Sequence, residues 1–145
     1  MRQARPARRG VAATELAFLL PLLAFLFAVG IDWSRVFYYA VIVDNCARNG
    51  AMYASDSYSG VVSPYPDITT AALADAPDIL TPTPTVTSTT GTYNYTTPAG
   101  AAASYDYVDC TVTYQFTTVS QIPGLPTTTT LSRTVRCFIA PQLPK

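Results

Sequence analysis

A basic leader followed by an apolar stretch opens the chain and constrains its fold more than any other feature. The leader, residues 1–10, carries four arginines and no acidic residue, whereas residues 11–31 carry a single charge, Glu15. A helix of that length rises about 31 Å, close to the ~30 Å hydrocarbon core of a bilayer. The stretch therefore predicts one membrane span. The arginines predict a cytoplasmic N-terminus, with the chain after residue 31 outside the cytoplasm.

A cleaved secretory signal and a plain uncleaved anchor are the other two interpretations of this segment. A signal peptide has an apolar region of roughly 7 to 15 residues and a small-residue cleavage site. Here the apolar stretch is longer, and only Ala28-Val29-Gly30 offers such a site. Neither interpretation explains Glu15, because a carboxylate inside a membrane helix costs roughly 2.5 to 3.5 kcal/mol on insertion scales and is functional by default.

Gly10, Val11 and Glu15 form a pattern in which the glutamate is the fifth residue after a glycine. This pattern resembles the processing site of type IV pilin-like proteins, where a membrane-embedded peptidase cuts after the glycine. The first third of the chain is similar to the TadE-like pseudopilins, accessory components of tight-adherence (Flp-type) pilus systems. The similar segments are Arg8-Arg9-Gly10-Val11-Ala12-Ala13-Thr14-Glu15-Leu16-Ala17, Leu20-Pro21-Leu22-Leu23, Gly30-Ile31-Asp32-Trp33-Ser34-Arg35 and Ala47-Arg48-Asn49-Gly50-Ala51.

This resemblance implies a structural protein that is matured by a prepilin peptidase between Gly10 and Val11 and that uses Glu15 in assembly. The implied partners are the inner-membrane pilus assembly platform, other pilin-like subunits and the lipid bilayer. The implied location is the inner (cell) membrane, as a single-pass protein with an extracytoplasmic C-terminal domain, or the pilus and cell surface. An alternative from another class is a membrane-tethered surface binding module with an uncleaved anchor helix.

The composition argues against catalysis and against nucleic-acid binding. The chain has no histidine, which removes the commonest general base and the commonest metal ligand, and its glycines form no phosphate-binding loop. No catalytic residue, cofactor or metal site is therefore predicted. Four of the nine basic residues lie in the leader, so the rest of the chain holds five basic residues against nine acidic ones. A nucleic-acid-binding surface would need the opposite balance.

The helix is expected to continue past the membrane span as far as residue 54. Apolar and small residues recur there at three- and four-residue steps, which is the period of an amphipathic helix. Four charged residues of this continuation are expected on exposed sides: Asp32, Arg35, Asp44 and Arg48. Small residues of the same segment, among them Ala47, Gly50 and Ala51, either pack against the protein's own domain or admit a neighbouring helix.

The whole chain is expected to be an α+β protein, in which the pilin-like helix 11–54 precedes a small extracytoplasmic domain with an antiparallel hairpin or sheet. Residues 55–104 are expected to be rich in loops, with a short helix over 68–76 capped by Asp67. The Thr/Pro-rich run after residue 80 is either an exposed loop or an edge strand through 85–89. Asn94-Tyr95-Thr96 matches the N-glycosylation pattern, which short sequences also match by chance.

Residues 105–145 are expected to form an antiparallel hairpin around a long turn at 122–126. Apolar side chains alternate with polar ones in both strands, at Val108, Cys110, Val112, Tyr114 and Phe116 and at Leu131, Val135, Cys137 and Ile139.

A pairing of Val112 with Val135 in this hairpin sets Cys110 opposite Cys137, within the range of a disulfide. The third cysteine, Cys46 on the helix, is then left unpaired. We expect it to behave as a small buried apolar residue packed under the sheet.

Cleavage between Gly10 and Val11 predicts a mature protein that begins at Val11 and lacks the basic leader. Gly10→Leu should block processing, because a side chain at this position obstructs the approach of the peptidase to the backbone. Intact-mass analysis of the protein from native membranes measures the outcome. A wild-type chain that still carries Met1, or one that begins at Ile31, contradicts the prediction.

Overall fold

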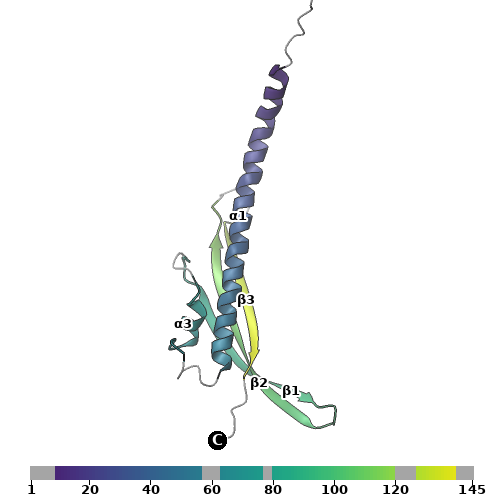
Figure 1. Cartoon of the computed structure of the whole chain (residues 1–145), viewed down its shortest axis with the longest axis vertical. Coiled ribbons are helices and arrows are strands. Elements are labelled where there is room, and N and C mark those ends of the chain that lie inside the picture. The colour runs from purple at the N-terminus through teal and green to yellow at the C-terminus, as the bar shows by residue number, and fades with distance from the viewer. Residues whose placement is uncertain (1–8, 57–62, 77–79, 120–126, 140–145) are drawn as a thin grey trace, which may run out of the picture.

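The computed structural model describes residues 9–56, 63–76, 80–119 and 127–139. Its helices are α1 (Arg9–Ser55) and α3 (Ile68–Leu73), and its strands are β1 (Thr85–Thr96), β2 (Ala102–Thr117) and β3 (Thr128–Phe138). The strands form an antiparallel sheet in the order β1-β2-β3. The sheet lies against the C-terminal half of α1, and the N-terminal half of the helix projects beyond it (Figure 1). The α+β class expected from the sequence is confirmed.

Helix α1 is one unbroken element that joins the apolar stretch to the domain. It spans Arg9–Ser55 and continues through Pro21, whereas the sequence predicted residues 11–54. The leader as far as residue 8 lies outside the described residues, as does the turn predicted at 122–126.

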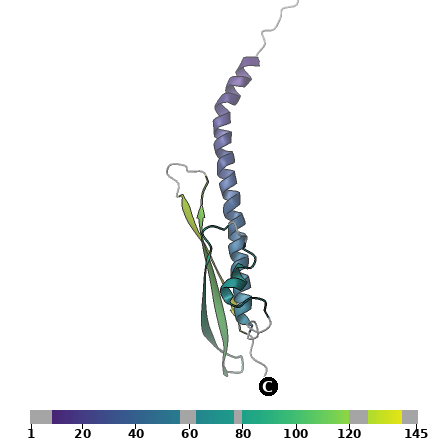
Figure 2. The ribbon, with the colours of Figure 1, turned by 90° about the vertical axis from the view of Figure 1, so that its left-hand side faces the viewer.

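A seam of apolar side chains joins α1 to the sheet, and Figure 2 shows the helix and the sheet as two adjacent layers. The ring of Tyr39 on α1 lies 5.4 Å from the ring of Tyr114 and 5.5 Å from that of Phe116. Burial of side chains such as these stabilises a domain by about 1.5 to 3 kcal/mol each. The buried cluster contains Val43, Cys46, Ala47, Ala51, Leu80, Cys110, Val112, Tyr114 and Phe116.

The alternation predicted for β2 is confirmed, because its even-numbered residues from Val108 to Phe116 are buried against α1. The odd-numbered residues point to the outer face of the sheet, which is polar at the end where β3 begins. On this face the hydroxyls of Thr113 and Ser132 lie 3.2 Å apart across the strands, and those of Thr111 and Thr134, nearer the middle of β3, lie 2.8 Å apart. Such a sheet has one face on the core and one in solvent, as antiparallel sheets commonly do.

Two segments differ from the sequence prediction. The Thr/Pro-rich run contains a strand, as one of the two interpretations from the sequence had it, but strand β1 extends beyond the predicted 85–89 as far as Thr96. It pairs with β2 from Thr85↔Thr113 to Thr96↔Ala102 and adds a third strand to the predicted hairpin. The sequence signal for β1 is weak because, at this edge, the side chains between its outward-facing threonines are also mostly exposed. The helix predicted over 68–76 ends at Leu73, and Asp67 caps it by accepting a hydrogen bond from the Thr70 N–H at 2.7 Å.

Small side chains on α1 pack inside the protein, which was one of the two interpretations open from the sequence. Ala47 and Ala51 are fully buried. At Gly50, an added Cβ would lie 2.5 Å from Cys110 Sγ and 3.0 Å from the Cβ of Ala72. The glycine therefore lets α1 approach both β2 and α3 closely.

Gly50→Ala should destabilise the domain by about 1 to 3 kcal/mol, because the new methyl group overpacks a closed contact. Gly30→Ala is the matched control: an added Cβ there meets nothing within 4 Å, and alanine is the better helix former by about 1 kcal/mol. Urea unfolding of the full chain in detergent, followed by near-ultraviolet circular dichroism, compares the two. Adding Cys110→Ala to Gly50→Ala should recover part of the loss, since it removes the obstructing sulfur. Equal stability of the two glycine variants would contradict the conclusion that Gly50 lets α1 approach β2 and α3 closely.

Candidate functional site

The N-terminal half of α1 is apolar on all sides, and none of its most apolar stretch is buried by the rest of the described chain. A helix that is apolar all round belongs either in a protein core or in a membrane. No core covers this one within the described residues, so its length and composition suit a bilayer. Its exposed large side chains are Leu16, Phe18, Leu19, Leu20, Leu22, Leu23, Phe25, Leu26, Phe27 and Ile31.

Glu15 lies on this apolar half and is exposed. None of the described residues makes an ion pair or hydrogen bond with its carboxylate. Gly10 and Val11 lie in the first turn of α1, about 7.5 Å and about 6 Å along the helix axis from Glu15 at ~1.5 Å per residue. The structure thus places the predicted processing position and the predicted assembly residue on one helix end, away from the folded domain (Figure 1).

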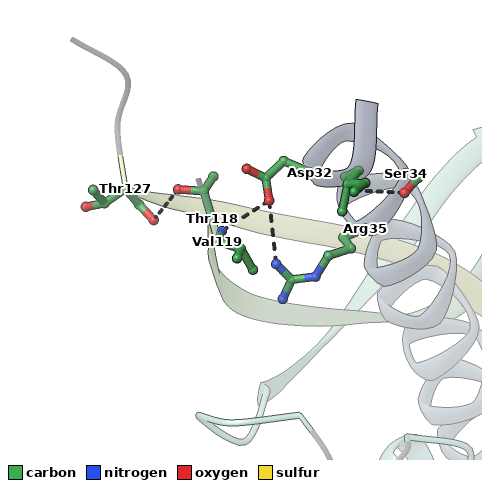
Figure 3. A network of polar contacts seen from close by, with 7 residues as sticks. Asp32, Ser34, Arg35, Thr118, Val119 and Thr127 are labelled. Carbon is green, nitrogen blue, oxygen red and sulfur yellow. Dashed lines mark hydrogen bonds and ion pairs between the residues drawn. The ribbon is translucent and has the colours of Figure 1, made fainter. Parts of the chain in front are cut away.

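Asp32 joins the helix to the sheet at the point where the apolar half ends, as Figure 3 shows. Its carboxylate Oδ1 accepts a hydrogen bond from the Val119 N–H at 3.1 Å and lies 3.6 Å from Arg35 Nη1. Arg35 in turn lies over the ring of Phe116, 5.2 Å from its centroid. We call Asp32, Arg35 and Val119 the membrane-end clamp.

The sequence missed this clamp and predicted that Asp32 is exposed, which is wrong. Asp32 is 8% exposed, because the end of β2 covers it. Residues 32 and 119 are far apart in the chain, so no local pattern indicates their contact. Asp44 and Arg48, which were expected on exposed sides of the helix four residues apart, form a surface ion pair at 3.1 Å.

The three cysteines lie together between α1 and the sheet, but the predicted register is wrong by two residues. Cys110 lies opposite Val135, and Cys137 lies opposite Val108. The predicted bridge between Cys110 and Cys137 is not formed, and all three thiols are free. The predicted side-chain face is right, because a shift of two residues keeps every side chain on its face.

Cys46 is fully buried in the core, as the sequence predicted. Burial raises the pKa of the Cys46 and Cys110 thiols above the usual value, with Asp75 adding to the effect at Cys46 and Cys137 at Cys110. Both thiols therefore stay protonated near neutral pH, when they are poor nucleophiles and poor metal ligands. Within the described residues, no group of three histidine, cysteine, aspartate or glutamate side chains could hold a metal ion.

The opposite end of the sheet carries exposed aromatic rings on its outer face. The Tyr105 ring lies 5.1 Å from that of Tyr93 and 4.4 Å from that of Phe138. Tyr95 completes this group, 5.4 Å from Tyr105. We call these four residues the distal aromatic cluster.

An ion pair lies beside the distal aromatic cluster on the outer face. Both Asp109 carboxylate oxygens accept hydrogen bonds from Arg136 at 2.7 Å. These bonds lower the pKa of Asp109 below its usual value. Arg136 also lies 3.9 Å from the ring centroid of Tyr107, so the guanidinium is held by a carboxylate and an aromatic face together.

The comparison with known families bears on the segment that contains Gly10, Val11 and Glu15. Residues 10–52 match the model of the TadE-like protein family. The resemblance predicted from the sequence is confirmed over this segment. No curated protein and no solved structure matches the chain significantly.

The TadE-like segment ends within α1, three residues before the helix does. It therefore contains the apolar half, Asp32 and Arg35 of the clamp, and the helix side of the core. TadE-like proteins are pilus-associated structural proteins, so the match suggests a protein related to the tight-adherence pilus. Together with the apolar helix, it suggests anchoring in a membrane.

Asp32→Ala should destabilise the domain by about 1.5 to 3 kcal/mol, because it removes a charged acceptor from a partly buried N–H and leaves Arg35 without its carboxylate. Asp44→Ala is the matched control on the same helix, and it should cost no more than about 0.5 kcal/mol because its pair is on the surface. Urea unfolding measures both changes, and amide hydrogen exchange at Val119 should speed up only in Asp32→Ala. Unchanged exchange at Val119 in that variant contradicts the clamp.

Proposed function

We propose that the chain is a TadE-like pseudopilin, a membrane-anchored minor or accessory subunit of a tight-adherence (Flp-type) pilus or a related secretion assembly. One observation carries the proposal: Gly10, Val11 and Glu15 begin an all-round apolar helix that runs without a break into the core of a small domain. The family match covers this helix from Gly10 to residue 52. A helix that serves only as a tether does not need to be part of the core of the domain it carries.

In this proposal a prepilin peptidase cuts between Gly10 and Val11 at the cytoplasmic side and removes the arginine-rich leader. The apolar half of α1 stays in the inner membrane, and the α+β domain stands on the extracytoplasmic side. Other pilin-like subunits and the assembly platform then recruit the mature chain. The role is structural: the chain offers surfaces to other subunits and performs no reaction.

Glu15 is the residue proposed to act in assembly. Cleavage creates a new ammonium group at Val11, and the glutamate of one subunit would neutralise the N-terminus of a neighbour. This is supported by the lack of any partner for the Glu15 carboxylate among the described residues. An unpaired carboxylate at membrane depth is costly, and pairing it with an ammonium recovers much of that cost.

A membrane-tethered surface binding module remains the second candidate, and the distal aromatic cluster favours it. Three of its four rings are exposed, namely Tyr93, Tyr95 and Phe138, and exposed aromatic groups are enriched in binding surfaces. In that case the helix would keep its leader. The mass of the native protein therefore separates the two candidates.

Glu15→Gln should insert into the membrane at least as well as the wild type, because it removes a charge from the span, but it should fail to assemble. Glu15→Asp is the matched control, since it keeps the charge on a shorter side chain and should retain part of the assembly. Membrane level, processing and co-purification with pilus components are compared for the three proteins. If Glu15→Gln is processed and still joins its partners at the wild-type level, the proposed role of Glu15 is wrong.

A further inference from the structure

The membrane-end clamp fixes the height of one end of the sheet relative to the membrane span. Asp32 is the first residue after the apolar stretch that ends at Ile31, and its carboxylate holds the backbone of Val119 at 3.1 Å. Val119 lies two residues beyond Thr117, the last residue of β2. Between them, the Thr118 N–H donates to the Thr127 carbonyl at 3.0 Å, which closes the pair of strands at this end. The end of β2 and the start of β3 therefore lie level with the first turn of α1 beyond the span, as Figure 3 shows.

Exposed apolar side chains lie near Asp32 along the chain on α1 and just after β2 on the sheet. Val119 is 69% exposed, and on the helix Trp33 is 59% and Phe37 65% exposed. The rings of Trp33 and Phe37 lie 5.9 Å apart. Trp33 and Phe37 continue the apolar surface of α1 past Asp32, and Val119 presents an exposed apolar side chain from the sheet end that Asp32 holds. We refer to these three residues as the patch.

The depth of this patch matches the interfacial layer of a bilayer. The headgroup region adds roughly 5 to 7 Å on each side of the hydrocarbon core, which corresponds to about four or five residues of helix. Trp33, two residues past Ile31, falls within that layer, and so does Val119 at the level of Asp32. Phe37, six residues past Ile31, lies about 9 Å beyond the span and therefore just outside the layer. Tryptophan is enriched at this depth because its ring is apolar and its N–H needs a polar partner.

We propose that the sheet end at Val119 rests in the interfacial layer of the same membrane that α1 spans, and that Asp32 holds it there. The inference rests on the proposed function in one respect, namely that α1 spans a bilayer. A lipid surface is the favoured occupant because the patch is continuous with the span. The domain then has two attachments to the membrane, its helix and its sheet end, and the distal aromatic cluster faces away from the lipid.

Tryptophan fluorescence tests the proposal directly, because Trp33 is the single tryptophan of the chain. Three versions of the full chain are compared: the wild type, Trp33→Phe with Val119→Trp, and Trp33→Phe with Phe138→Trp. The last is the matched control, since Phe138 is also exposed but lies at the other end of β3. Each is reconstituted into vesicles of phosphatidylethanolamine and phosphatidylglycerol, with and without lipids brominated near the headgroup end of the acyl chains.

The brominated lipids should quench the tryptophans at positions 33 and 119 and leave the one at 138 unquenched. Aqueous acrylamide should quench the tryptophan at 138 and leave those at 33 and 119 largely unquenched. Adding Asp32→Ala should abolish the quenching at 119 and leave that at 33. If position 33 is quenched and 119 behaves like 138, the sheet end does not contact lipid and the inference is wrong. Quenching at position 33 would still support the proposal that α1 spans the membrane. If position 33 is not quenched either, the proposed membrane anchor itself fails.

A protein partner on the patch is a separate outcome of the same measurement. A tryptophan at 119 that resists both lipid bromines and acrylamide is covered by protein, for example by a second copy, and this also overturns the inference. The comparison of the three tryptophan positions uses no clamp variant, so the test holds even if Asp32→Ala unfolds the domain.

Discussion

The packing of α1 against the sheet is the interaction on which the rest of the structure depends. A three-stranded sheet with one covered face has little core of its own, and here the helix supplies the other half of that core through Val43, Cys46 and Ala47. The same helix carries the apolar half that suits a membrane. The domain is thereby joined to this apolar half without a flexible linker, because Ile31 at the end of the apolar stretch and Asp32 of the clamp are neighbours in one helix.

Two carboxylates on α1 illustrate how surroundings decide the role of a residue. Asp32 is covered by the end of β2 and has a backbone N–H and an arginine as partners, so its charge is compensated within the protein. Glu15, about 26 Å away along the helix at ~1.5 Å per residue, has no such partner among the described residues. Asp32 therefore has its contacts within the domain, whereas the described residues offer none to Glu15.

The two ends of the sheet differ in the same way. At the clamp end the apolar side chains continue the surface of the span, while at the far end tyrosine rings stack on one another across β1 and β2. The outer face between them is lined by threonine and serine hydroxyls that bond across the strands. The outer face of the sheet is therefore polar between its two ends, and the ends themselves carry apolar or aromatic side chains.

The sequence alone determined the features that depend on local periodicity and composition. The long helix, the alternation in β2, the burial of Cys46 and the pair of Asp44 with Arg48 follow from residues a few positions apart. The pattern of Gly10, Val11 and Glu15, together with the other similar segments in the first third of the chain, indicated the family.

Only the tertiary structure decided the features that depend on contacts between distant segments. Strand β1 exists because β2 supplies a partner for every residue from Thr85 to Thr96, although its own alternation is weak. The register that separates Cys110 from Cys137 is set by the summed pairing of whole strands, and a shift of two residues leaves the sequence pattern unchanged. The burial of Asp32 arises from a hydrogen bond to a residue 87 positions away, and no local pattern in a sequence carries information over that distance.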